Sequence, residues 1–249
     1  MLRKTVIIIT IIVFINVLLS CGIDEYYYLP QVPEINVTTD FNTNATVNFP
    51  KIPDDYYYAA CYTIFYRIYV SSHSTQNSSP SEFNLISPYL NNDYNYLLQF
   101  TNPVNTSATT STNTFKNRNF FKLEFEGTDN INMLPKNGGK LLIDFPTTVG
   151  DIPFASLNGE RKYLLRSSEL TSPEPSDDLY FRNTPELYNL EYATDKNKNA
   201  DVAGRSGDNM NLTYVAMYIA AVGTNPNNFT TIYSKPTFIS VFRLPNKNS

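Results

Sequence analysis

Apolar and polar side chains alternate along most of this chain after residue 33, and this alternation predicts strands rather than helices. Residues 35–39 and 45–50 form two short alternating runs. The longest run extends from Tyr56 to Val70. Because successive strand residues point to opposite faces, one face carries Tyr62, Ile64, Tyr66 and Ile68 and the other carries Thr63, Phe65, Arg67 and Tyr69.

The C-terminal part of the chain also has strand patterns, and a larger share of its residues is apolar. Residues 212–222 are apolar at nearly every position, the loop 223–228 turns the chain, and strands are predicted at 232–233 and 237–244. Both alternate sets of side chains within 214–221 are apolar, so the sequence leaves the register of this strand open. A strand that is apolar on both faces indicates a second layer over its outer side.

The segment between these two parts, residues 71–210, contains further strand patterns. The firmest is 121–126, where Glu124 and Glu126 fall on the polar face and are expected to be solvated. The run 140–145 follows the turn 137–139 and is expected to pair with 121–126, and a weaker strand is predicted at 161–166. A second small β-domain inside this segment is an open alternative.

The first twenty residues have the pattern of a secretory leader. Arg3 and Lys4 precede an apolar run from Val6 to Leu19, which is short for a membrane span. The run ends in Leu18-Leu19-Ser20-Cys21, which resembles the lipobox of bacterial lipoproteins; Leu19 departs from the usual Ala or Ser, a departure that spirochaetal lipoproteins tolerate. An uncleaved N-terminal anchor is the alternative.

The lipoprotein resemblance implies where the protein resides. It implies cleavage before Cys21, attachment of diacylglycerol and acyl chains such as palmitate to that cysteine, and a bacterial cell-envelope protein held by lipid. Gly22 rather than Asp follows the cysteine, which by resemblance to enteric sorting rules implies the outer membrane or the cell surface rather than the inner membrane. Cys61 is then the remaining cysteine, so it is expected to be a buried thiol without a disulfide.

Four short motifs resemble those of a fibronectin type III domain. Val47 to Pro53 stands where its second strand and turn read Val-x-Trp-x-x-Pro, with Phe49 in place of the tryptophan. The third, sixth and last strands are matched by Tyr62 to Tyr66, Tyr214 to Ala221 and Ser234-Lys235-Pro236. The resemblance implies an all-β immunoglobulin/fibronectin-III-like sandwich. Its organisation would be a signal peptide (1–20), a lipidated tether (21–32) and a sandwich (33–247) made mainly by 33–70 and 211–245, with an insertion at 71–210.

Composition and charge limit the classes of partner and of chemistry that the sequence supports. The chain carries a formal charge of −4, which becomes −6 without Arg3 and Lys4, and it shows no basic stripe, so nucleic acid is excluded as a partner. His73 is the single histidine and lies in a polar turn, and no nucleophile elbow, phosphate-binding loop or zinc ligand set is present. We therefore predict no catalytic residues and no cofactor.

Two candidate sites remain. Asp195, Asn197, Asn199 and Asp201 place oxygen ligands at alternate positions, as a Ca²⁺ loop would, but Ala200 replaces the turn glycine and lysines are interleaved. Tyr56, Tyr57 and Tyr58, together with Asn225 and Asn227 in the loop 223–228, offer amphipathic rings and amides to a ligand.

The preferred interpretation is a non-enzymatic, lipid-anchored envelope protein that binds another envelope protein, an extracellular macromolecule or a glycan. One alternative is an extracytoplasmic carbohydrate-active hydrolase that uses a carboxylate pair, for which the chain offers Asp54/Asp55, Glu124/Glu126 and Asp177/Asp178. The other is a Ca²⁺-dependent structural module. The membrane, through the lipid on Cys21, is an expected partner in the preferred interpretation.

Overall fold

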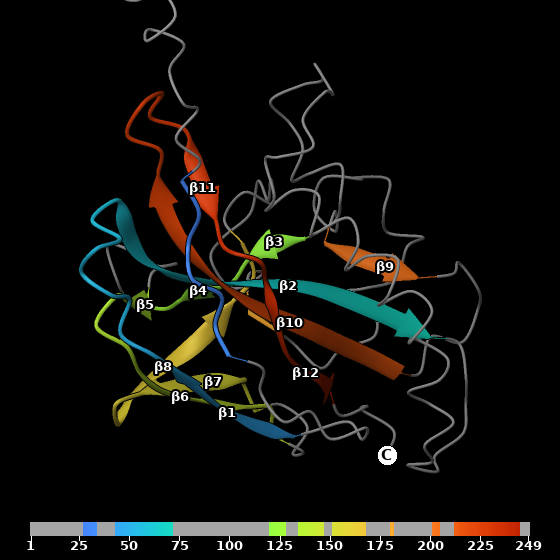
Figure 1. The fold of residues 1–249 in the computed structure, drawn as a ribbon. Helices are drawn as coiled ribbons and strands as arrows, with labels where there is room; N and C mark the ends of the chain where they lie inside the picture. The colour runs from blue at the N-terminus through green and yellow to red at the C-terminus, as the bar shows by residue number, and fades with distance from the viewer. Residues whose placement is uncertain are drawn as a thin grey trace, which may run out of the picture.

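The computed structural model describes residues 27–33, 43–71, 120–127, 134–146, 151–167, 180–181, 201–204 and 212–244. Every regular element within these ranges is a strand, which confirms the all-β class. The strands form two mainly antiparallel sheets, consistent with a β-sandwich (Figure 1). Among the described residues, no helix is long and apolar enough to cross a membrane.

The larger sheet is built around two long antiparallel strands that lie side by side in Figure 1, β2 (Ala59–Ser71) and β10 (Leu212–Thr224). They pair from Leu212 opposite Ser71 to Gly223 opposite Ala59. The free edge of β10 pairs with β11 (Thr231–Tyr233) and β12 (Thr237–Leu244). The other edge of β2 pairs with β3 (Phe121–Lys122), β5 (Leu134–Pro135) and, in parallel, β9 (Val202–Gly204).

The long strand β2 begins at Ala59, three residues later than the sequence predicts. The amide of Tyr56 donates to the carbonyl of Pro53 at 3.1 Å, and the amide of Ala59 donates to the carbonyl of Tyr56 at 2.9 Å. Because these local bonds close successive turns, Tyr56, Tyr57 and Tyr58 leave the sheet ladder and lie in the turn before β2.

The smaller sheet has the order β1-β6-β7-β8-β4 among the described residues. Its members are β1 (Asn44–Phe49), β6 (Gly139–Asp144), β7 (Phe154–Leu157), β8 (Glu160–Leu165) and β4 (Glu124–Phe125). The strands predicted at 45–50 and 161–166 are thus confirmed as β1 and β8. The predicted pairing of 140–145 with 121–126 is wrong, because β6 pairs with β1 and β7.

The segment 121–125 passes from one sheet to the other. β3 pairs with β2, β4 pairs with β8, and Leu123 lies between them. This change of sheet breaks the simple alternation, so Glu124 is buried, with 3% of its surface exposed, rather than solvated as expected. Glu126 is half-buried and accepts a hydrogen bond from the Tyr180 hydroxyl.

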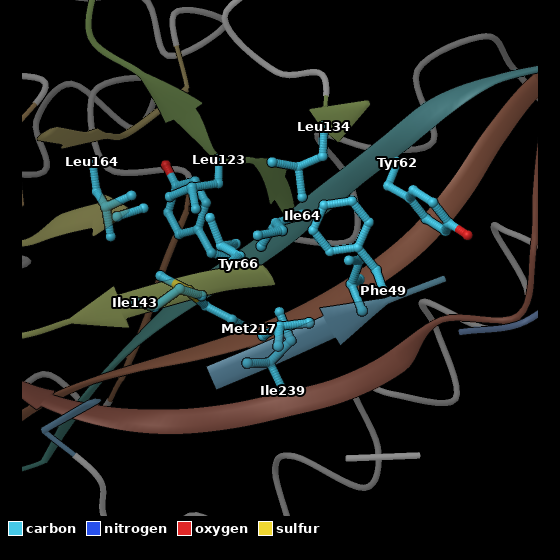
Figure 2. Packing of buried hydrophobic residues seen from close by; sticks show 14 of the residues in the cluster. Phe49, Tyr62, Ile64, Tyr66, Leu123, Leu134, Ile143, Leu164, Met217 and Ile239 are labelled. Carbon is cyan, nitrogen blue, oxygen red and sulfur yellow. The ribbon is translucent and has the colours of Figure 1, made fainter. Parts of the chain in front are cut away.

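One hydrophobic cluster fills the space between the two sheets (Figure 2). Phe49 and Ile143 of the smaller sheet meet Tyr62, Ile64 and Met217 of the larger sheet in this cluster. Burial of an aliphatic or aromatic side chain of this size stabilises the fold by about 1.5–3 kcal/mol. The inner face of β10 carries Val215, Met217, Ile219 and Ala221, which settles the register left open by the sequence.

The outer face of the larger sheet is also buried, as the two-faced apolar pattern of β10 predicts. A second cluster on this face contains Phe65, Tyr69, Phe120, Tyr214, Ala216, Tyr218, Ala220 and Val241. On β12, the register shifts between Ser240 and Phe238, opposite Met217 and Tyr218. This bulge changes the parity of the strand, so that Ile239 and Phe242 both belong to the inner cluster.

The N-terminal residues 27–33 pack against the sandwich. Leu29 and Val32 are buried in the inner cluster, and the Thr237 hydroxyl donates to the Val32 carbonyl at 2.6 Å. The side-chain amide of Gln31 donates to the same hydroxyl at 3.2 Å. The later part of the expected tether is therefore fixed to the body, while the strand predicted at 35–39 lies outside the described residues.

Candidate functional site

Aromatic side chains from distant parts of the chain gather at one end of the larger sheet. We call this surface the aromatic end, and its members are Tyr27, Tyr28, Tyr56, Tyr57, Tyr58 and the loop 225–230. Its rings meet edge to face, with centroids 5.1 Å apart for Tyr27–Tyr58 and 5.3 Å apart for Tyr57–Tyr58. The Tyr58 hydroxyl donates to the Tyr28 carbonyl at 2.7 Å, and Tyr28 packs edge to face on Tyr56 at 6.1 Å.

The two halves of the aromatic end are joined where β2 begins and β10 ends. The amide of Thr224 donates to the Tyr58 carbonyl at 3.0 Å, and the Tyr27 hydroxyl donates to Oδ1 of Asn227 at 3.4 Å. Gly223 permits this close approach, because a Cβ there would lie 2.5 Å from the Tyr58 carbonyl oxygen. The structure thus brings together the two candidate groups that the sequence offered separately, Tyr56–Tyr58 and Asn225 with Asn227.

The loop 225–230 is held by its own asparagines. Oδ1 of Asn225 accepts from the Asn227 amide at 2.9 Å, and Oδ1 of Asn228 accepts from the Thr230 amide at 3.0 Å. This bonding presents Phe229 to solvent in the left-handed backbone region, with φ of 57°. A bulky residue rarely occupies that region, so the loop holds an exposed side chain on a strained backbone.

Much of the aromatic end is exposed to solvent. Tyr28 and Tyr57 are each 69% exposed and Phe229 is 82% exposed, more than the other large hydrophobic side chains of the described residues. Partial burial, followed by the neighbouring Tyr56 and Tyr28, raises the pKa of Tyr58 above its ordinary value. The nearby Lys51 ammonium bonds to the Asp54 carboxylate at 2.8 Å and lowers its pKa.

A second cluster of polar side chains is buried beneath β2. Asp201, which precedes β9, accepts from Arg166 through both oxygens, at 2.5 Å to Nη2 and 2.8 Å to Nε. The Tyr66 hydroxyl donates to Oδ2 of Asp201 at 2.7 Å and accepts from the Ser167 amide at 3.0 Å. Asp201 and Tyr66 are completely buried, and Arg166 is 4% exposed.

This buried cluster is sealed rather than open to a substrate. Burial, followed by the Asp201 carboxylate, raises the pKa of Tyr66 well above its ordinary value, so the phenol keeps its proton. Both oxygens of Asp201 already accept hydrogen bonds, and Phe181 packs edge to face on the Tyr66 ring at 5.0 Å. The cluster connects β2, β9 and the end of β8 and is suited to fixing the fold.

The other residues that the sequence offers as candidate ligands, catalytic groups or reactive thiols do not form a site among the described residues. Asp195, Asn197 and Asn199 lie outside the described residues, and so do Cys21, His73 and the pair Asp177/Asp178. Asp201, the fourth member of the proposed cation loop, faces Arg166 instead of an open site. Among the described residues, no three His, Cys, Asp or Glu side chains group as metal ligands. Cys61 is a buried free cysteine as predicted, and burial raises the pKa of its thiol.

Sequence reasoning missed two parts of these sites. Nothing in the sequence indicated the pairing of Arg166 with Asp201, which are 35 residues apart. Phe229 was also not proposed as part of a binding surface, although an aromatic residue in the Asn-rich loop 225–230 is a usable signal. The sequence offers Tyr26–Tyr28 and Tyr56–Tyr58 as separate groups of rings and does not indicate that they meet. Comparison of the chain with protein-family models, with curated proteins and with solved structures finds no match.

Proposed function

We propose that this chain is a non-enzymatic, lipid-anchored protein of the bacterial cell envelope that acts as a binding module through the aromatic end. The observation that carries the proposal is the exposure of Tyr28 and Tyr57, each 69% exposed, which pack on Tyr56 and Tyr58 respectively. The loop 225–230, bonded to Tyr27, adds Phe229, which is 82% exposed. A group of neighbouring exposed aromatic side chains marks a site of contact with a partner, because a partner that covers them removes apolar surface from water.

The leader pattern supports the lipid anchor. The lipobox-like Leu18-Leu19-Ser20-Cys21 would place acyl chains on Cys21, six residues before the first tyrosine of the aromatic end. The sealed state of Asp201 and Tyr66 supports a non-enzymatic role, since neither group is open to a substrate.

The strand order supports the finer proposal of a fibronectin-III-like sandwich. In that architecture the third, sixth and last strands are neighbours in one sheet, and the second strand lies in the other. β2, β10 and β12 adjoin in this order, and β1 belongs to the smaller sheet. The chain departs from the pattern because β6, β7 and β8 come from the long segment 71–210.

Labelling of the cell with a palmitate analogue tests the anchor. The full chain and a Cys61→Ser variant are expected to take up the label, and a Cys21→Ser variant is expected to take up none. Label on the Cys21→Ser variant would remove this part of the proposal.

Photo-crosslinking from the full chain in the cell tests the binding surface. Benzoylphenylalanine at position 57 or 229 is expected to yield adducts, whereas the same group at position 163, an exposed tyrosine of the smaller sheet, is expected to yield few. Equal adduct yields at the three positions would reject the aromatic end as the binding surface.

A further inference from the structure

We infer that the aromatic end seats in the headgroup region of the bilayer that holds the lipid anchor, and so fixes the orientation of the sandwich on the membrane. The inference deepens the proposed function by naming the partner of the aromatic end, and it rests on the proposed acylation of Cys21.

The spacing between the anchor and the aromatic end is short. Tyr27 and Tyr28 follow Cys21 by six and seven residues. Seven fully extended residues span at most ~25 Å, so no arrangement of the intervening chain moves Tyr28 farther than that from the acylated cysteine. Tyr28 is bonded to Tyr58 and packed on Tyr56, so these tyrosines also stay within short reach of the acylated cysteine.

The exposed side chains suit a bilayer interface. Tyrosine combines an apolar ring with a hydroxyl that remains hydrated, which is why aromatic residues gather at the level of lipid headgroups. Tyr57 offers such a ring, and Phe229 offers a wholly apolar one on a raised loop. Burial raises the pKa of Tyr56 and Tyr58, so these phenols enter the interface uncharged.

The charges near the aromatic end favour a zwitterionic surface. The members of the aromatic end include no lysine or arginine. The adjoining turn carries Asp54 and Asp55, and the charges of Lys51 and Lys136 both act on Asp54. Attraction to anionic lipid requires a cluster of basic residues next to the membrane. The expected lipid partner is therefore a neutral headgroup such as phosphatidylcholine.

A saccharide is the other ligand class that aromatic rings commonly contact, and the loop argues against it. Recognition of a sugar needs polar side chains that converge on its hydroxyl groups. The Oδ1 atoms of Asn225, Asn227 and Asn228 instead accept hydrogen bonds from within the aromatic end. We therefore assign the bilayer as the occupant and make the saccharide an outcome of the test.

Single tryptophans provide the test, because the chain contains none. The full-length, acylated protein is reconstituted in phosphatidylcholine vesicles, with and without brominated phosphatidylcholine. Phe229→Trp and Tyr57→Trp variants are expected to show blue-shifted emission and at least a twofold loss of intensity with bromine. The matched control is Tyr163→Trp on β8, a strand that lies well away from the β10–β11 loop in Figure 1, and its emission is expected to change little.

The possible results separate the inference from the proposed anchor. A protein that is acylated by mass spectrometry and floats with the vesicles, but whose tryptophans at 57 and 229 are quenched no more than that at 163, overturns the inference and leaves the anchor intact. A protein without acyl chains overturns both. Unquenched emission at 229 that shifts on addition of cell-wall polysaccharide also overturns the inference and assigns the surface to a sugar.

Discussion

The residues of the buried Asp201 cluster and those of the aromatic end differ most clearly in their exposure to solvent. Asp201 and Tyr66 are fully buried and satisfy one another, whereas Tyr57 and Phe229 present most of their surface to water. A buried ion pair contributes little net stability, but the loss of one partner leaves an uncompensated charge in the core. The energetic role of Asp201 therefore depends on Arg166.

An Arg166→Met substitution is expected to lower the free energy of unfolding by about 3–5 kcal/mol, because it leaves the Asp201 carboxylate buried with Tyr66 as its remaining described partner. Urea unfolding measures the change. An Arg166→Met/Asp201→Leu double variant removes the charge as well and is expected to be more stable than the single variant. If the double variant is the less stable of the two, the ion-pair interpretation is wrong.

Alkaline pH is expected to weaken the fold through Tyr62. Burial raises the pKa of this tyrosine from 10.0 to about 12, and its hydroxyl donates to the Pro50 carbonyl. The unfolded chain releases this proton first, so the stabilising contribution is complete below about pH 10 and is lost as the pH approaches 12. A Tyr62→Phe variant should show a flatter decline in unfolding free energy across this range.

The control for this experiment is the range below about pH 9, where the difference in unfolding free energy between the unsubstituted chain and the Tyr62→Phe variant should be constant. Parallel declines above pH 10 would mean that Tyr62 does not carry the dependence. Tyr66 and Cys61, whose pKa values burial also raises, act in the same direction and contribute to a decline that persists in the variant.

At the scale of elements, the close approach of β10 to the turn before β2 determines the shape of the aromatic end. A Gly223→Ala substitution is expected to cost about 1–3 kcal/mol, because the new methyl group would overlap the Tyr58 carbonyl and disturb the Thr224–Tyr58 hydrogen bond. Thermal unfolding checks this, with exposed Thr224→Ala as the matched control. An equal effect of the two substitutions would contradict the steric explanation.

The sequence predicts elements well where alternation is long and uninterrupted. The alternation of side chains between the two faces of a strand correctly predicts which residues of β2, from Tyr62 to Ile68, point inward. It also predicts that both faces of β10 are apolar. The pattern fails where the backbone changes course. The crossing at Leu123 and the bulge at Ile239 alter parity by local geometry, and neither Gly nor Pro marks these positions.

The sequence indicates single residues of the candidate site but not their proximity, because that proximity depends on how distant strands pair. Tyr56–Tyr58 and Asn225 stand out by composition, but their meeting depends on the register in which Gly223 lies opposite Ala59. No local pattern encodes the register between β2 and β10, which lie far apart in the sequence. The same holds for Arg166 and Asp201, whose pairing depends on β9 lying parallel to β2.

At the scale of the whole molecule, the segment 27–33 is part of the core and should contribute to global stability. Removal of the Leu29 side chain by a Leu29→Ala substitution is expected to lower the unfolding free energy by about 2–4 kcal/mol, since this side chain is 5% exposed in the inner cluster. Urea unfolding of the full chain measures it. A Tyr28→Ala substitution next to it, at a 69% exposed position, serves as the control and should have a smaller effect.

The bonding of residues 31 and 32 to Thr237 has a mechanical consequence. A load applied to the chain before Tyr27 reaches β12 through the Val32–Thr237 and Gln31–Thr237 hydrogen bonds. β12 is in turn fastened along β10, the central strand of the larger sheet. Tension from the N-terminal side is thus distributed over a whole sheet, and the sandwich resists being pulled apart one strand at a time.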